Sequence, residues 1–156
     1  MDEKKVICIE DTKFIYQTNF SGDPERDAFG SDARKGNLII PDPAQARELM
    51  DMGVNVRETK PGPDDDPNEF VPTYFVAIKV NYDSAWPPKI YLVSGDAEPR
   101  ELDAETVGLI DTCYVRNVNA VLSTYRSPKM HATTLYVKTM YVEQNVEADP
   151  FASRYR

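Results

Sequence analysis

Alternation of apolar and polar residues predicts a chain built mainly of β-strands. The clearest strand covers residues 74–82, where every second position is apolar or aromatic: Tyr74, Val76, Ile78, Val80 and Tyr82. Shorter stretches of this kind predict strands at residues 5–10, 13–20, 37–40, 54–57, 89–93, 114–122 and 133–143. The turn signal Asp11-Thr12 separates the first two stretches, which therefore form either a hairpin or one long bent strand. A set of about six to eight strands predicts a β-barrel or a β-sandwich.

Two short helices are expected among these strands. The clearer one follows Asp42, a good N-cap residue, and begins at Pro43, which suits the first helical position. It ends before Gly53, where a left-handed backbone is expected. Asp103 is a suitable cap for a second helix over residues 104–110. Polar residues and turn residues predict long loops at residues 21–33, 60–69 and 123–132.

Length and composition indicate a single cytoplasmic domain. A chain of 156 residues is long enough to bury a core of its own. Its start, Met-Asp-Glu-Lys-Lys, is too charged for a signal peptide, and no apolar run reaches the length of a membrane span. Cys8 and Cys113 are expected to be buried, reduced thiols, and a disulfide between them is left open.

Residues that could carry catalysis or hold a metal are nearly absent. His131 is the only histidine, and no serine lies in a nucleophile-elbow sequence. Two distant cysteines and one histidine do not supply a zinc site, and no glycine-rich phosphate loop is present. The three successive acids Asp64, Asp65 and Asp66 lie in a proline-rich segment that reads as a solvated loop. We therefore expect no enzyme, no cofactor and no metal ion.

Aromatic and cationic residues recur together within the predicted strands. Unpaired nucleic acid binds to such a surface because its bases stack on aromatic rings while cations follow the phosphates. The net charge of -8 argues against a duplex-binding module, which is basic over a whole face, but allows a local basic groove. These observations predict a protein that binds unpaired nucleic acid in a sequence-tolerant way. The candidate nucleic-acid-binding residues are Lys13, Tyr16, Phe20, Arg34, Lys35, Lys79, Trp86, Lys89, Arg116, Arg126 and Lys138.

The acidic balance also supports a second hypothesis. A chain with this net charge, and with the acidic segment 64–69, could mimic DNA and inhibit a host nucleic-acid enzyme by presenting carboxylates in place of phosphates. Binding to a basic protein, without affinity for oligonucleotides, would distinguish this alternative. A third reading, a β-rich virion or assembly protein, requires only the strands and prolines.

The order of several segments resembles that of small single-stranded DNA-binding proteins encoded by tailed phages. The similar segments are residues 13–22, Gly30, residues 34–37, 46–49, 52–56, 72–82, 87–89, 103–111, 136–142 and 149–151. The resemblance implies a mainly β fold, an OB-like β-barrel with two short helices and long loops, over residues 1–143. It also implies protection of single strands during phage DNA replication or recombination, without catalysis, in the bacterial host cytoplasm. Single-stranded DNA is then the expected partner, together with replication or recombination proteins but no membrane; exposed strand edges leave a homodimer open.

The C-terminal tail, residues 144–156, departs from this family pattern. Its acidic and aromatic tip, Asp149-Pro150-Phe151, resembles the partner-recruiting tails of single-strand binders. Five further residues follow, and they include Arg154 and Arg156. This tail is therefore expected to pack on the body, or to contact DNA or a neighbouring subunit through its arginines.

Overall fold

The computed structural model describes residues 6–27, 29–95, 98–127 and 132–144. His131, Arg154 and Arg156 lie outside the described residues, as does the tail beyond Gln144. One sheet contains all the strands of the described part: β1 (Val6–Thr12), β2 (Phe14–Asn19), β3 (Arg34–Ile40), β4 (Val56–Glu58), β5 (Tyr74–Val80), β6 (Lys89–Ser94), β7 (Arg100–Leu102), β8 (Val115–Ser127) and β9 (Ala132–Gln144). The helices are α1 (Pro43–Asp51) and two short 3-10 helices, η1 (Pro24–Arg26) and η2 (Val107–Asp111).

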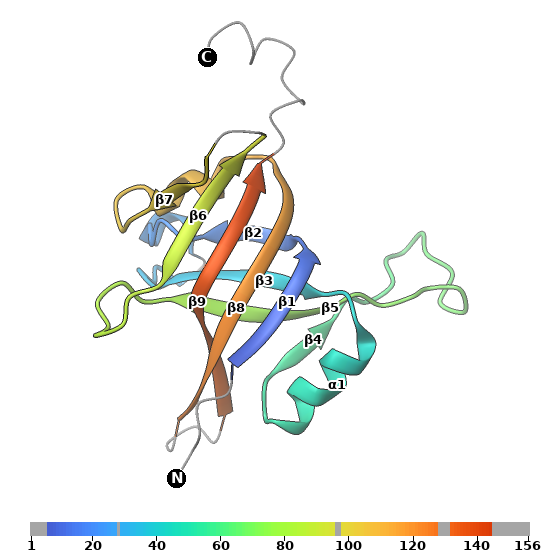
Figure 1. The fold of residues 1–156 in the computed structure, drawn as a ribbon. Helices are drawn as coiled ribbons and strands as arrows, with labels where there is room; N and C mark the ends of the chain where they lie inside the picture. Colours follow the sequence, from blue (N-terminus) through green and yellow to red (C-terminus); the bar gives the residue numbers. More distant parts are fainter. Residues whose placement is uncertain (1–5, 28, 96–97, 128–131, 145–156) are drawn as a thin grey trace, which may run out of the picture.

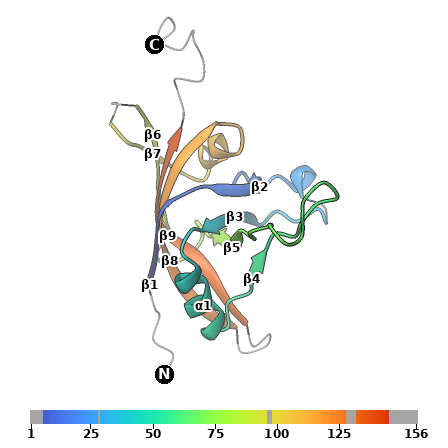
Figure 2. The same ribbon diagram turned by 90° about the vertical axis from the view of Figure 1, so that its right-hand side faces the viewer.

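The sheet folds into two crossing layers. Its hydrogen-bonded path runs β1-β8-β9-β5-β3-β2, with β6 added beside β9, β7 beside β6, and β4 beside β5. Strands β1, β8, β9 and β6 cross over β2, β3 and β5 (Figures 1 and 2). The prediction of a mainly β chain is confirmed, whereas the path of hydrogen bonds is open and does not confirm a closed barrel.

The first two strands form a bent segment and not a hairpin. β1 pairs with β8, whereas β2 pairs with β3 in the other layer. Asp11 has a left-handed backbone (φ 50°), and the register of β1 shifts between Ile9 and Thr12. This irregularity turns the chain at Lys13, so the two open ends of the sheet are covalently joined.

The core lies between the two layers. Its fully buried side chains include Ile9, Leu38, Ile78, Ile90, Leu122, Leu135 and Met140 from the strands, and Phe20, which directly follows β2. The ring of Phe20 packs on Phe14, with centroids 5.2 Å apart, and covers Gly36. Phe20 is 0% exposed, so it presents no face to a base, and we leave it out of the candidate interface.

One of the two expected helices forms as an α-helix. Asp42 accepts a hydrogen bond from the backbone N–H of Ala44, Pro43 opens α1, and Gly53 follows it with φ 86°. The segment after Asp103 forms only turns and the short helix η2. The carboxylate of Asp111, at the end of η2, accepts hydrogen bonds from the Thr18 hydroxyl and from the backbone N–H groups of Phe20 and Ser21. These bonds fix η2 against the end of β2.

Other expectations are corrected. The loop expected at residues 123–132 is shorter, because β8 continues to Ser127 and β9 begins at Ala132. Cys8 is exposed and not buried, and both cysteines are free thiols. No helix in the described part of the chain is long and apolar enough to cross a membrane.

Candidate nucleic-acid interface

The outward side of β2, β3 and β5 brings predicted site residues from distant parts of the sequence together. In the antiparallel pair β3–β5, Lys35 lies opposite Lys79, Asn37 opposite Ala77, and Ile39 opposite Phe75. The intervening residues Leu38, Val76 and Ile78 point into the core. Because successive strand residues face opposite sides, this alternation places both lysines on the outside. We call the outward set Tyr16, Lys35, Asn37, Phe75, Lys79 and Tyr136 the outer face.

Tyr16 is the exposed aromatic residue of the outer face. Its side chain is 65% exposed, and its ring meets the Phe75 ring edge-on, with centroids 5.3 Å apart and an interplanar angle of 80°. Tyr16 has a left-handed backbone (φ 63°) within the part of β2 where the register shifts, between Ile15 and Asn19. Phe75 is only 6% exposed, so it supports the Tyr16 ring and leaves one face of that ring for a ligand.

Lys35 and Lys79 form a cation pair across the strands. Like charges directly opposite one another destabilise a sheet. Here Asp27 of the β2–β3 loop offsets the repulsion, because its carboxylate lies 2.7 Å from the Lys35 ammonium. Among the described residues, no carboxylate lies within ion-pair distance of Lys79, which is exposed to solvent.

Asp27 is held as a carboxylate by its neighbours. The hydrogen bond from Lys35, followed by those from the backbone N–H groups of Ser31 and Phe29, lowers the pKa of Asp27 to about 2. The two backbone bonds are both 2.9 Å long and order the loop around Asp27. The ion pair therefore stays charged at every pH at which the protein would act.

A small polar pocket opens beside this ion pair. Lys35, Asp27, Gly36 and the amide side chains of Gln17 and Asn37 line it. Arg26, a further lining residue, donates from Nη2 to the Thr18 carbonyl oxygen, and its buried Nε has no partner within the described residues. Hydrogen-bond donors and acceptors thus lie at the edge of the outer face.

Strand β9 extends the outer face beyond β5. Tyr136 lies next to Lys79 in the parallel pair β5–β9. Its ring meets the Tyr125 ring of β8 edge-on, with centroids 6.3 Å apart. Lys138, two residues further along β9, is exposed on the same side as Tyr136. Phe75, Tyr125, Tyr136 and Asn37 are not among the candidate residues predicted from the sequence. Alternation along each strand already places Phe75 on the side of Lys79 and Tyr136 on the side of Lys138. The pairing of these strands with β3 and β8, which brings in Asn37 and Tyr125, cannot be read from the sequence.

Arg34 lies on the opposite side of β3 from Lys35. It pairs with the buried Val80, and its guanidinium donates hydrogen bonds to the carbonyl oxygens of Phe20 and Ser21. The guanidinium also lies 5.6 Å from the centre of the Tyr82 ring. Burial raises the pKa of Tyr82 to about 12, against the opposing effect of Arg34. Arg34 thus fastens the end of β2 to the start of β3.

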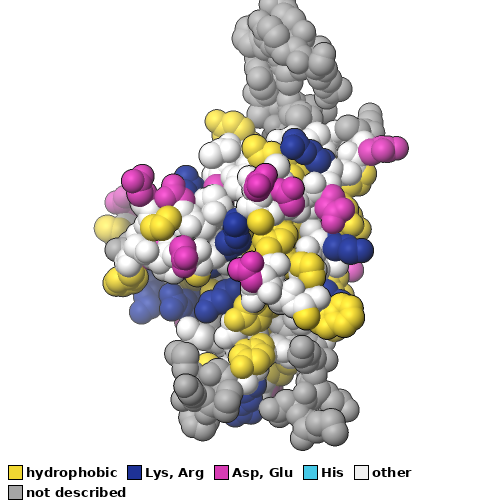
Figure 3. Space-filling model, turned by 90° about the vertical axis from the view of Figure 1, so that its left-hand side faces the viewer, with side chains coloured by type: hydrophobic (Ala, Val, Ile, Leu, Met, Phe, Trp, Pro, Cys, Tyr) yellow, Lys and Arg dark blue, Asp and Glu magenta, His cyan; other side chains and the backbone are white. Residues whose placement is uncertain are grey.

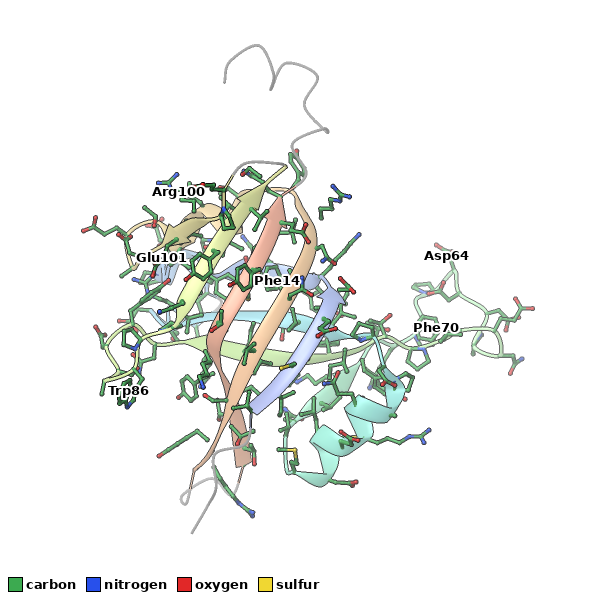
Figure 4. All side chains as sticks on the ribbon, viewed as in Figure 1. Phe14, Asp64, Phe70, Trp86, Arg100 and Glu101 are labelled. Carbon is green, nitrogen blue, oxygen red and sulfur yellow. The ribbon has the colours of Figure 1, made fainter. Side chains whose placement is uncertain are left out.

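The remaining predicted residues are spread around the molecule. Trp86 is 88% exposed at the tip of the β5–β6 loop, on the side away from the loop that carries Asp64 and Phe70 (Figure 4). Lys13 lies at the bend between β1 and β2, and Lys89 begins β6. Arg116 lies where the register of β8 shifts. Arg126, next to Tyr125 in the same strand, faces the opposite side.

Charges of both signs share the surface on the Trp86 side of the molecule. Figure 3 shows Lys and Arg side chains there between Asp and Glu side chains, with exposed hydrophobic side chains among them. The proline-rich acidic loop of residues 60–69 connects β4 with β5 and lies at the Tyr74 end of β5, whereas Lys79 lies near the other end. Its carboxylates therefore do not cover Lys35 and Lys79.

Comparison with known proteins identifies the family. A family model described as "Putative phage ssDNA-binding domain" matches residues 2–156. The chain belongs to this family. The membership confirms the resemblance noted in the sequence. No curated protein matches the chain.

Solved structures similar to this family member include two phage proteins. The C-terminal truncation of the single-stranded DNA-binding protein from bacteriophage Enc34 aligns with a TM-score of 0.50 and 9% identity, over 90% of this chain and 84% of that one. The untruncated Enc34 protein aligns with a TM-score of 0.47 and 11% identity, over 90% of this chain and 81% of that one. The single-stranded DNA-binding protein gp2.5 of bacteriophage T7 aligns with a TM-score of 0.42 and 12% identity, over 97% of both chains. The first likeness shows a shared fold.

Proposed function

We propose that this protein binds single-stranded DNA without sequence preference, on the outer face, during phage DNA replication or recombination. The observation that carries the proposal is the register of β3, β5 and β9, which places Lys35, Lys79 and Tyr136 side by side on the surface. Stacked bases contribute about 1–3 kcal/mol each, and lysines neutralise phosphates. Family membership supports the same ligand. The protein would act in the host cytoplasm by binding alone, without catalysis.

We further propose that the sheet is an OB-like barrel. β1 and β2 would serve as one bent strand that pairs with β8 in one layer and with β3 in the other. The parallel pair β5–β9 would join the layers on the opposite side. Proteins with OB-folds bind oligonucleotides on the outer side of the strands that correspond to β3 and β5. The fold likeness to the truncated Enc34 protein supports this assignment.

Fluorescence anisotropy with labelled oligo-dT and a matched duplex, at several salt concentrations, tests the proposed function. We expect tight binding to the single strand, much weaker binding to the duplex, and affinity that falls steeply with salt. Absence of oligonucleotide binding at low salt would reject the proposal and favour the DNA-mimic alternative, whose acidic loop, residues 60–69, is exposed.

A further inference from the structure

A second aromatic pair lies on the outward side of the sheet, away from the outer face. Tyr91 of β6 and Tyr141 of β9 are direct neighbours in the parallel pair β6–β9. Their rings are stacked, with centroids 4.9 Å apart and planes inclined by 15°. Tyr141 is 41% exposed, while the next residues in both strands, Ile90 and Met140 among them, are buried.

Strand β9 connects this pair with the outer face. Its early part, at Leu135 and Tyr136, pairs with β5, and its later part, from Thr139 onward, pairs with β6. Figure 1 shows β9 crossing β5 and then running beside β6. The outward side chains follow one another as Tyr136, Lys138, Thr139 and Tyr141. At about 3.3 Å per residue, Tyr141 lies roughly 16 Å beyond Tyr136.

Cations lie between the two groups of aromatic residues. Lys138 is exposed on β9, and Lys89 is exposed on β6 directly beside Thr139. Within the described part of the chain, neither ammonium group lies within ion-pair distance of a carboxylate. An extended strand of DNA that runs along β9 would therefore meet unpaired cations between its stacking positions, as single-strand binding surfaces require.

The charge changes sign beyond the tyrosine pair. Glu143 follows Tyr141 on the outward side of β9, and its carboxylate accepts a hydrogen bond from the Asn117 amide. That same amide also donates to the carboxylate of Asp11. Two carboxylates thus lie next to each other where the row ends, and they would repel phosphates. The part of the surface that attracts phosphates therefore ends at Tyr141.

We infer that Tyr91 and Tyr141, with Lys89, form a second stacking platform that receives single-stranded DNA leaving the outer face along β9. The inference rests on the proposed function. A stacked tyrosine pair can serve only to stabilise a sheet. That role does not explain why unpaired lysines lie between this pair and the outer face. The alternative occupant of this surface is a second copy of the chain.

The test uses the full chain with the double substitution Tyr91→Thr and Tyr141→Thr, which removes both rings but leaves residues that favour strands. Tyr114→Thr is the control for the loss of an exposed tyrosine, because Tyr114 precedes Val115, which lies opposite Gln144 beyond the end of the row at Glu143. The probes are labelled oligo-dT strands of increasing length, with unfolding curves recorded for each variant. For strands long enough to span both platforms, we expect affinity to fall at least about thirtyfold, the loss of two stacked bases at about 1 kcal/mol or more each. The site size should shorten by about two nucleotides, one for each tyrosine.

Short strands, which the outer face alone accommodates, should bind the double variant as they bind the unmodified chain. Lys89→Gln, a surface change that spares the ring pair, should make the salt dependence shallower for long strands only. Equal site size and affinity in the unmodified chain and the double variant would overturn the inference. So would a change in sedimentation mass without a change in DNA binding, which would assign the surface to self-association. Failure of the unmodified chain to bind any strand would instead reject the proposed function.

Discussion

Lys35 and Lys79 lie directly opposite each other on neighbouring antiparallel strands, yet within the described residues only Lys35 has an acidic partner. Two adjacent ammonium groups repel one another, and the Asp27 carboxylate compensates for that repulsion on one side only. The cation that remains available to a phosphate without prior loss of a salt bridge is Lys79. The two lysines are therefore expected to differ in their contribution to binding.

We predict that Lys79→Gln weakens single-stranded DNA binding at all sequences. Loss of one phosphate contact should reduce the slope of log affinity against log salt by about 0.7. The measurement is an anisotropy titration with oligo-dT at four or more salt concentrations. Lys60→Gln is the matched control, because Lys60 is exposed in the loop that leaves the sheet at the other end. An unchanged slope in Lys79→Gln would remove Lys79 from the interface.

We predict that Asp27→Asn strengthens DNA binding at low salt, because it releases the Lys35 ammonium for a phosphate. The same change should remove the pH-dependent contribution of the Asp27–Lys35 ion pair to the free energy of unfolding. The pKa of Asp27 in the folded chain is about 2, below its ordinary value of 3.8. The ion pair therefore contributes its full stability above pH 3.8, and this contribution is lost as pH falls toward 2.

Urea unfolding between pH 2 and pH 7 checks this prediction. The unmodified chain should lose stability more steeply below pH 4 than Asp27→Asn does. Asp32→Asn, a change at an exposed acid of the same loop, is the control and should keep the steep loss. Parallel pH profiles for the unmodified chain and Asp27→Asn would contradict the prediction.

The sequence predicts those elements whose pattern is local. Strand β5 alternates between core and surface, and α1 carries its own N-cap, Asp42, and its own terminating residue, Gly53. The end of β8 was missed because residues 123–127 are held in the strand by pairing with β9, a non-local effect, whereas β9 lies within one residue of the expected range 133–143. Cap residues and alternation can be read along the chain, whereas pairing cannot.

The candidate site was predicted in composition more than in arrangement. Arg34 and Lys35 are adjacent in sequence, so the strand necessarily separates them onto opposite sides. Phe20 is buried because it must cover Gly36 of the paired strand, which only the fold reveals. Tyr136 joins Lys79 through a parallel pairing of residues far apart in the chain. The types of residue thus indicated the class of ligand, whereas the pairing of the strands determines which residues share the outer face.

We predict that Gly36→Ala destabilises the protein. A Cβ at this position would lie 2.8 Å from Cζ of Phe20 and 3.2 Å from the methyl carbon of Thr18. Overpacking of this kind costs about 1–3 kcal/mol. Urea unfolding measures the loss. Gly62→Ala is the control for the loss of a glycine alone, because Gly62 has no left-handed backbone and a Cβ there would meet only the Asp65 carboxylate, at 3.3 Å. If the packing argument holds, Phe20→Leu should recover part of the stability lost in Gly36→Ala.

Two substitutions at Tyr16 separate its contribution to DNA binding from its effect on the stability of the fold. Its φ of 63° is costly for any residue with a Cβ, by about 1–2 kcal/mol, and is free of that cost for glycine. Tyr16→Ala and Tyr16→Gly both remove the ring, so both should lose about 1–3 kcal/mol of single-strand affinity. In urea unfolding, however, Tyr16→Gly should be the more stable of the two. Equal DNA affinity in all three chains would exclude Tyr16 from stacking, and a less stable glycine variant would show that the left-handed backbone is not strained.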